Sequence, residues 1–213
     1  MKKALVISIL AFYGMVNIPI NAQSSTPFES THFYVGLGVS APQGGVVAMT
    51  LILPNGWGTS ATYNLLTPVA QNLPSDYKGG SGIFNFFGSG NNDKVYDEIT
   101  AISFRALKEF PTKSKYVRVG LEAGPSLVRT EIADNFVFRP VSGGDIFGYP
   151  SNYDYEVITS NTIGLSLKGK LELAFTRPFG FEIGITSNIN SKRSYYGADF
   201  LITLGHVRDK IVK

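Results

Sequence analysis

The 213-residue sequence contains no cysteine, so disulfide bonds and cysteine-based metal sites are excluded. Charge is also scarce, because Asp, Glu, Lys and Arg make up only 16% of the residues and the formal net charge is +3. The basic residues form no cluster, which argues against a nucleic-acid partner. After the N-terminal leader, no stretch has the pattern of a long helix or of a second apolar span.

The first residues have the layout of a cleavable signal peptide. Lys2 and Lys3 precede a largely apolar stretch, and Asn21-Ala22-Gln23 then places a small residue at the expected cut. A membrane anchor is the alternative, but the apolar core is shorter than the roughly 20 residues that span a bilayer. We therefore expect export, with residues 1–22 removed. Loss of the two lysines lowers the formal net charge to +1, and the missing cysteine excludes a lipoprotein anchor.

The rest of the chain alternates apolar and polar residues in short runs bounded by Gly, Pro and Asn, which is typical of β-strands. The eight runs are 31–41, 45–53, 57–66, 98–110, 115–130, 157–176, 179–189 and 193–208. Alternation is clearer in the second half of the chain than in the first three runs. The sequence therefore predicts an all-β fold, an eight-stranded antiparallel up-and-down barrel over 31–209, with a flexible leader (23–30) and a short tail (210–213).

Alternation alone does not say which face of each strand points outward, because a soluble lipocalin-like barrel has the same pattern inverted. Volume separates the two arrangements. The interior of an eight-stranded barrel is only just wide enough for side chains. Four to six Leu, Ile, Val or Phe from each of several strands would overfill it, whereas Gly, Ser, Thr and a few charged residues fit. We therefore expect the apolar face to point outward into lipid.

The connections between the runs support a transmembrane barrel. Three are tight, at Pro54-Asn55-Gly56, Lys113-Ser114 and Arg177-Pro178, and two are long, at 67–97 and 131–156. If both termini lie in the periplasm, every tight turn of this set is periplasmic and both long connections are extracellular. Short periplasmic turns with longer outer loops are the rule for outer-membrane barrels. The predicted location is the outer membrane, with both termini in the periplasm.

Four stretches carry recognisable motifs: Gly120-Leu-Glu-Ala-Gly-Pro-Ser126, residues 165–180, Ser187-Asn-Ile-Asn-Ser-Lys-Arg-Ser-Tyr-Tyr-Gly197, and the final strand ending Leu204-Gly-His-Val-Arg-Asp209. They resemble small Gram-negative outer-membrane β-barrel proteins, the OmpA/OmpX-like eight-stranded barrels. The resemblance covers 98–209 well and 31–66 loosely. Because its motifs are structural, it implies a fold and a location and no reaction. Many such barrels end on an aromatic residue, whereas this sequence continues to Lys213.

The predicted inward face carries charge of both signs. Its residues are Arg105, Glu109, Arg118, Glu122, Lys168, Lys170, Glu172, Glu182 and Asp199. Isolated charges in a narrow lumen are costly, so a balanced set predicts ion pairs. If Lys113-Ser114 is a two-residue hairpin loop, Glu109 faces Arg118 and Arg105 faces Glu122, which is the stabilising cross-strand arrangement. We expect a structural plug of salt bridges, and a selective water-filled path is the alternative.

The sequence offers little for catalysis or metal binding. Its two histidines, His32 and His206, open the first strand and close the last, so they fall at the periplasmic rim and can be neighbours on barrel closure. Two ligands without a third make weak evidence for a metal. We therefore predict no catalytic residue, no cofactor and no metal.

The two long connections are the best candidates for specific recognition, since loops on rigid scaffolds carry function. The aromatic residues proposed for it are Phe84, Phe86, Phe87, Phe147, Tyr149 and Tyr153. Packing in the loops or at the membrane interface is the simpler alternative. The Gly-rich stretch 79–92 lacks the Gly-Lys-Ser/Thr ending of a phosphate loop. The sequence thus predicts a monomeric, non-enzymatic barrel contacting lipid and, through 67–97 and 131–156, an extracellular protein or surface ligand. A small pore, a soluble periplasmic carrier and a lipid-modifying enzyme are the alternatives.

Overall fold

The computed structural model describes residues 28–41, 43–79, 94–112, 114, 116–140 and 151–209. The predicted signal peptide, most of the leader and the tail 210–213 lie outside these ranges. Among the described residues, no helix has the length and apolar character needed to cross a membrane.

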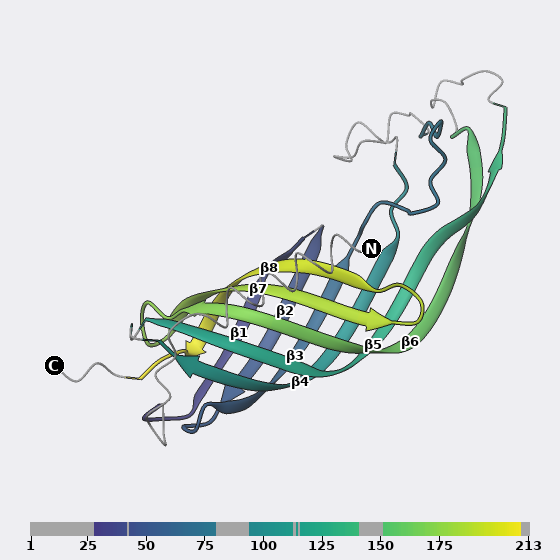
Figure 1. Cartoon of the computed structure of the whole chain (residues 1–213). Coiled ribbons are helices and arrows are strands. Elements are labelled where there is room, and N and C mark those ends of the chain that lie inside the picture. Colours follow the sequence, from purple (N-terminus) through teal and green to yellow (C-terminus); the bar gives the residue numbers. More distant parts are fainter. Residues whose placement is uncertain are drawn as a thin grey trace. The chain divides into compact units, whose positions relative to one another are not determined.

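Eight strands form one closed antiparallel barrel in chain order, as predicted (Figure 1). They are β1 (His32–Ser40), β2 (Gly44–Ile52), β3 (Trp57–Leu66), β4 (Glu98–Pro111), β5 (Val117–Phe138), β6 (Tyr153–Leu173), β7 (Phe179–Asn190) and β8 (Tyr195–His206). The first strand closes the barrel on the last, in a register that runs from Phe33↔His206 to Ser40↔Asp199. Closure leaves no unpaired sheet edge along this ladder.

The chain divides into two compact units. The first, the barrel unit, comprises the chain up to Leu66 together with Thr100–Val128 and Thr162–Lys213. The second, which we call the ribbon unit, comprises Thr67–Ile99 and Arg129–Asn161. Strands β4, β5 and β6 contribute residues to both units.

Burial along the barrel strands alternates with period two, because successive side chains point to opposite faces of the sheet. In β2, Ala48, Thr50 and Ile52 are buried, whereas Met49 and Leu51 are exposed. Within the barrel unit, most charged and hydroxyl side chains of β5 to β8 are buried, and most large apolar side chains are exposed. The interior is therefore polar where the sequence alternates most clearly.

Apolar side chains from β1, β2 and β4 also point into the barrel. Tyr34, Ile52 and Leu107 pack with Phe28, Ala174 and Val207 in one buried cluster, and Leu201 packs with Val46 and Ala48 in another. The interior is thus part salt-bridge network and part ordinary apolar core. Phe28 falls in the predicted flexible leader, yet its ring is buried and its backbone N–H donates to the Pro54 carbonyl at 3.1 Å.

One tight turn agrees with the sequence prediction, and another differs from it. Gly56 has φ 77°, the left-handed region that the Asn-Gly turn requires, and the Leu53 N–H donates to the Trp57 carbonyl at 2.7 Å. The predicted two-residue loop at Lys113-Ser114 is longer in the structure, because β4 ends at Pro111 and β5 begins at Val117. The Thr112 hydroxyl donates to the Val117 carbonyl at 2.8 Å and takes the place of a ladder hydrogen bond there.

Nearly half of the predicted loop 131–156 is strand. β5 continues to Phe138 and β6 already begins at Tyr153, so only 139–152 connects them. The sequence prediction ended the strands too early because several consecutive residues here, such as Phe136, Val137 and Phe138, are apolar and break simple alternation. These residues still have the aromatic and β-branched character that favours strands.

Candidate functional site

The inward-facing charges form one buried network in the barrel unit. All nine residues predicted for the lumen are at most 5% exposed: Arg105, Glu109, Arg118, Glu122, Lys168, Lys170, Glu172, Glu182 and Asp199. They come from β4, β5, β6, β7 and β8. Four cations face five carboxylates, so the network is balanced to within one formal charge when all the groups are ionised.

Lys170 is the centre of the network. Its Nζ lies 3.3 Å from Glu109, 3.3 Å from Glu122, 3.4 Å from Glu182 and 3.9 Å from Glu172. It also donates to the Tyr34 hydroxyl at 2.8 Å. Gly120 makes room for this long side chain, since a Cβ at that position would collide with the Lys170 methylenes. One ammonium group therefore joins carboxylates from four strands and fills the middle of the lumen.

Arg118 lies at one end of the network, next to the start of β1 and the end of β8. Its guanidinium pairs with Glu109 at 3.4 Å and also binds Glu172 and the Val207 carbonyl. The Tyr34 hydroxyl donates to the other oxygen of Glu172 at 2.7 Å. Each of these groups thus has several partners, which is the condition under which buried charges can be tolerated.

The other end of the network is formed by Lys168 and Asp199. Lys168 lies 2.7 Å from Glu182 and 3.2 Å from Asp199. The Asp199 carboxylate also accepts hydrogen bonds from the hydroxyls of Ser40 at 2.6 Å and Thr186 at 2.5 Å. These contacts connect β1, β6, β7 and β8 and so tie together the strands on both sides of the barrel's closing seam.

Both cross-strand pairs expected from the sequence register are present. Arg105 lies 3.2 Å from Glu122, and Arg118 lies 3.4 Å from Glu109, even though the intervening turn is longer than two residues. Hydroxyls that the sequence did not single out complete the first pair. Ser60 donates to Glu122 at 2.7 Å, and Arg105 donates to Thr62 at 2.7 Å.

A second group of inward-facing polar atoms has no hydrogen-bond partner among the described residues. They include Asn64 Oδ1, Ser103 Oγ and Ser166 Oγ, all buried. Ser166 and Tyr195 lie on either side of Asn188 in the β6–β7–β8 ladder. Buried polar atoms need hydrogen bonds, and bound water is the usual way to provide them. The lumen thus has a tightly ion-paired section and a section lined by hydroxyls and amides.

The two histidines meet at the rim, with ring centroids 5.2 Å apart. Asp209, which the sequence did not suggest, joins them: its carboxylate lies 3.3 Å from His32 Nε2 and accepts from the Ser30 hydroxyl at 2.5 Å. His32, His206 and Asp209 therefore have the residue types and the proximity of a metal site, with their ligand atoms within 4.8 Å of one another.

The contact of His32 with Arg118 disfavours a metal at this place. Arg118 Nη1 lies 2.6 Å from His32 Nδ1, and a guanidinium can only donate, so Nδ1 must accept. In the neutral ring the proton is then on Nε2, where it points at Asp209 and leaves no lone pair for a metal. The geometry fits a set of hydrogen bonds among Ser30, His32 and Asp209, which we call the rim latch and which holds Asp209 against the start of β1.

The ribbon unit contains an aromatic cluster. Phe136 packs against Tyr77, Tyr153 and Tyr155 with ring centroids 6.2, 6.4 and 5.4 Å apart, and Tyr153 packs on Phe138 at 5.5 Å. The Tyr153 hydroxyl donates to Asp76 at 2.8 Å. Tyr153, one of the residues proposed for recognition, thus has a packing role here. The other five, Phe84, Phe86, Phe87, Phe147 and Tyr149, lie outside the described residues.

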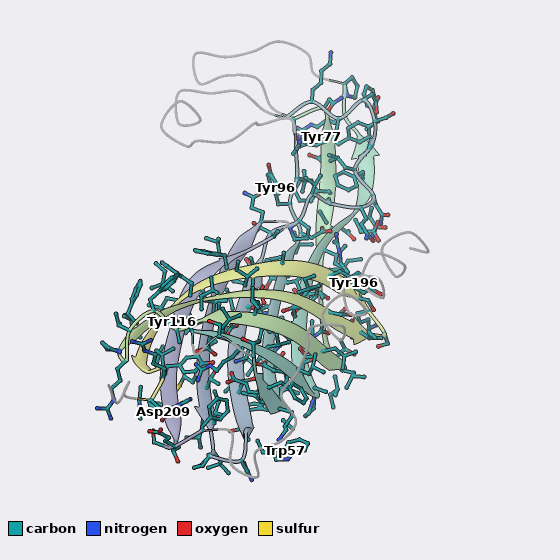
Figure 2. All side chains as sticks on the ribbon, turned by 60° about the vertical axis from the view of Figure 1, so that its left-hand side comes forward. Trp57, Tyr77, Tyr96, Tyr116, Tyr196 and Asp209 are labelled. Atoms are coloured by element: carbon teal, nitrogen blue, oxygen red, sulfur yellow. The ribbon has the colours of Figure 1, made fainter. Side chains whose placement is uncertain are left out.

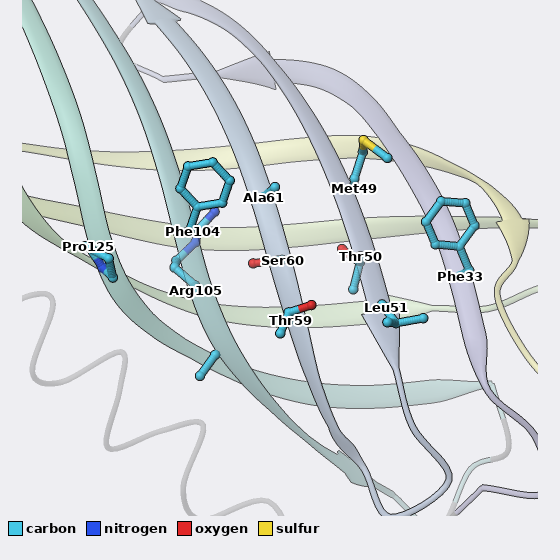
Figure 3. Close-up of a pocket in the computed structure, with 11 residues that line it drawn as sticks. Phe33, Met49, Thr50, Leu51, Thr59, Ser60, Ala61, Phe104, Arg105 and Pro125 are labelled. Carbon is cyan, nitrogen blue, oxygen red and sulfur yellow. The ribbon is translucent and has the colours of Figure 1, made fainter.

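The outer wall of the barrel has an apolar groove of about 600 Å³ over β1 to β5. Figure 3 shows Thr59 and Ala61 between Phe104 on one side and Met49 and Phe33 on the other. Its lining is almost wholly apolar, and it has no convergent set of polar groups of the kind that fixes a polar ligand. Hydrocarbon chains are the chemistry that suits such a surface.

The sequence did not predict three groups of residues that line the barrel interior or its rim. Tyr34, Ser60 and Thr62 lie in the early strands, where alternation was weak, although each is one residue from an apolar outward-facing neighbour. Asp209 follows the last strand, and no pattern marked it. The two apolar clusters, one containing Leu107 and the other Leu201, were missed because they interrupt an otherwise polar inward face.

No family model and no curated protein matches the sequence. Among solved structures, the N-terminal β-barrel domain of Pseudomonas aeruginosa OprF is similar at 11% identity over 84% of this chain and 98% of that one, with a TM-score of 0.48. Ail, the attachment invasion locus protein of Yersinia pestis, is similar in its complex with the heparin analogue sucrose octasulfate, at 12% identity over 82% and 96%, with a TM-score of 0.46. Neisserial surface protein A is similar at 15% identity over 81% and 90%, with a TM-score of 0.40. The fold assignment itself rests on the strand ladder of this chain.

Proposed function

We propose that this protein is a non-enzymatic integral β-barrel of the bacterial outer membrane, with a lumen closed by the Lys170-centred network. The observation that carries the proposal is the inverted distribution of side chains across the barrel wall. Charges are buried inside, and large apolar residues are exposed outside. A soluble lipocalin-like carrier would need the opposite, an apolar interior able to hold its ligand.

The apolar exterior runs around the whole barrel. Every strand contributes at least one side chain that is between 43% and 57% exposed: Leu37, Met49, Tyr63, Phe104, Leu127, Leu165, Ile183 and Ile202. Soluble monomers rarely expose contiguous apolar patches beyond a few hundred Å². A bilayer turns this exposed surface into buried surface, and the closed ladder satisfies the backbone polar groups that lipid cannot.

Aromatic residues stand at both ends of the barrel strands, as in the interfacial girdles of membrane barrels. Trp57 begins β3, Tyr116 precedes β5 and Phe179 begins β7, whereas Tyr196 lies at the start of β8 near the opposite end. Figure 2 shows Trp57 near the same end of the barrel as Asp209, and Tyr196 away from it. Exposed Trp57 and Tyr116 would place their rings at the headgroup level.

The direction of insertion follows from the connections. The beginning of β1 pairs with the end of β8, so the two ends of the barrel chain are at one rim. We propose that this rim faces the periplasm and that the long connections, 67–97 and 131–156, face the exterior, where they would meet a protein or surface ligand. The connections at this rim, 53–56, 112–116 and 174–178, are short, and short turns are typical of the periplasmic side of such barrels.

A narrow water-filled pore is the second candidate. It is favoured by the unpartnered hydroxyl and amide atoms of Asn64, Ser103 and Ser166, which suit hydration. The ion-paired section around Lys170 opposes it, because no side chain there is more than 5% exposed. We therefore favour a plug, with conductance in planar bilayers close to zero. Steady single-channel conductance of the wild type would favour the pore.

Location and orientation are tested together in cells. Boiled and unboiled membrane fractions are compared on a gel, since a folded barrel migrates differently from the unfolded chain. Intact cells are then treated with protease. We expect a mobility shift on boiling and cleavage within 67–97 or 131–156. Recovery of the protein in the soluble periplasmic fraction without a shift would contradict a membrane barrel, and cleavage only after cell lysis would reverse the orientation.

A further inference from the structure

The longest strands of the molecule leave part of one strand unpaired. The ladder between β6 and β7 begins at Gly164↔Asn190, although β6 itself begins at Tyr153. Within this stretch, Asp154 lies 3.5 Å from Arg139, and Thr162 shares a hydrogen bond with Ser191 at 3.0 Å. Residues 155–161 between them have β5 on one side and no described strand on the other. We call this segment the free edge.

The free edge is open to solvent on both faces. Residues 154–159 are all exposed in succession, where a strand inside a barrel wall alternates. Tyr155 is 42% exposed, Val157 57% and Ile158 42%. An exposed strand edge presents unpaired N–H and C=O groups and is a template for another strand.

The sequence of the free edge, Tyr155-Glu-Val-Ile-Thr-Ser-Asn161, lacks the usual protection against such pairing. It contains no Lys, Arg, Pro or Gly, and its only charge is Glu156. Natural edges are commonly blocked by Lys, Pro, bulges or inward-pointing charges. This edge instead has a β-branched centre, Val157-Ile158-Thr159, which favours the extended conformation.

The free edge complements itself when it is paired antiparallel about Ile158. In that register Glu156 faces Ser160, Val157 faces Thr159, Tyr155 faces Asn161 and Ile158 faces its own copy. No like charges are opposed, and the one carboxylate meets a hydroxyl that can donate to it. Opposite residues in an antiparallel pair point to the same face, so only a register centred on one residue is compatible with two-fold symmetry.

We propose that the free edge is a self-association surface, in which residues 155–161 of two copies of this chain pair as antiparallel strands about a two-fold axis at Ile158. Two β5–β6 ribbons then form one four-stranded sheet, and the backbone groups of both edges become satisfied. The sequence alone suggested a monomer, because the length of the ribbon was not foreseen. The proposal concerns the ribbon unit and does not depend on where the barrel resides.

Single cysteine variants of the full-length mature protein test the register, because the natural chain has no cysteine. Ile158→Cys brings two thiols face to face in the dimer, within the Cα separation of about 4.4–6.8 Å that a disulfide spans. Val157→Cys is the matched control. Val157 is more exposed than Ile158, yet its two copies lie diagonally, about 7–8 Å apart. Each purified variant is oxidised mildly in detergent at several protein concentrations and run on a non-reducing gel.

We expect a disulfide-linked dimer for Ile158→Cys at several times the yield for Val157→Cys, and a cross-linked product when Val157→Cys and Thr159→Cys proteins are mixed. Yields that follow exposure, with Val157→Cys ahead, would overturn the register. Sedimentation of the wild type provides the second measurement. A dimer should dissociate roughly tenfold more readily in Ile158→Lys, which opposes like charges, and little in Ile158→Thr. A monomeric wild type at every concentration would overturn the proposal.

Discussion

The same ion-pair chemistry appears in two regions of this molecule and has a different structural setting in each. In the lumen, Lys170 contacts four carboxylates and is completely buried. In the ribbon unit, Arg139 meets Asp154 alone, at 3.5 Å, with side chains 64% and 66% exposed. Arg129 and Glu131 form a second pair in the ribbon unit, in which Arg129 is exposed and Glu131 is half-buried.

The contrast shows that contact distance says little about stabilisation. An exposed pair is screened by water and contributes roughly 0–1 kcal/mol. A buried pair has lost its hydration, so each partner depends on the others, and removing one leaves an uncompensated charge that costs about 3–5 kcal/mol. The lumen network is therefore expected to act as a unit, whereas the ribbon pairs are expected to act singly.

The largest effect is expected from reversing the charge of Glu122. Glu122→Arg would place a cation beside Arg105 and Lys170, which both contact Glu122 now, and should destabilise the barrel by more than the roughly 3–5 kcal/mol of simple removal. Adding Arg105→Glu should restore part of the loss, because the cross-strand pair is re-formed with opposite polarity. Urea unfolding in detergent micelles measures both. A double variant no better than the sum of the single variants would show that the two residues are not coupled.

Removing the central cation should have the next largest effect. Lys170→Met keeps the length of the side chain but leaves Glu109, Glu122, Glu172 and Glu182 without their shared partner. The expected loss of unfolding free energy is about 3–5 kcal/mol. Lys108→Met is the control, since Lys108 donates to the Asn55 carbonyl at an exposed site. Equal losses in the two variants would contradict a special role for the buried lysine.

A smaller, pH-dependent effect is expected at the rim latch. Partial burial alone would raise the pKa of Asp209, but hydrogen bonds from the Ser30 hydroxyl, the Glu29 N–H and His32 hold it below the ordinary value of 3.8. A lowered folded-state pKa contributes stability above the ordinary value, and this contribution is lost as the pH falls through the folded value. Asp209→Asn should therefore destabilise the barrel modestly at neutral pH.

The difference in unfolding free energy between wild type and Asp209→Asn should shrink as the pH is lowered below about 4. Unfolding curves recorded between neutral and acidic pH give this difference directly, and Glu29→Gln serves as a control because only the backbone of Glu29 contacts Asp209. A difference that stays constant with pH would mean that the Asp209 carboxylate is not the stabilising group.

The barrel and its charge pairs were predictable because both follow from period-two alternation and one hairpin. Placing Arg105 against Glu122 and Glu109 against Arg118 needed only that β4 and β5 be neighbours and that the turn keep its parity. The five-residue connection between Pro111 and Val117 changes the loop without shifting these pairs. Register is robust here because a one-residue slip would turn every inward charge to the apolar outer surface of the barrel.

The remaining features depend on contacts between residues far apart in sequence. Lys170 reaches Tyr34 and Glu109 across the lumen, and His32 reaches Asp209 through closure of β1 on β8. The alternation of polar and apolar residues within one strand does not tell which distant residues will be in contact. The length of β6 was missed for a different reason: alternation is absent in residues 154–159, where the side chains on both faces of the strand are exposed.

The smallest effect is expected from the exposed pair, and it completes the contrast between the two regions. Arg139→Ala removes the partner of Asp154 in the ribbon unit, where water replaces the lost contact, so stability should change by less than about 0.5 kcal/mol. Asp154→Asn and the double variant close a thermodynamic cycle, measured by urea unfolding and by the protease sensitivity of 131–156. A coupling well above about 0.5 kcal/mol would mean that this pair is desolvated in solution, as it would be if Asp154 were covered when two ribbons pair at the adjacent free edge.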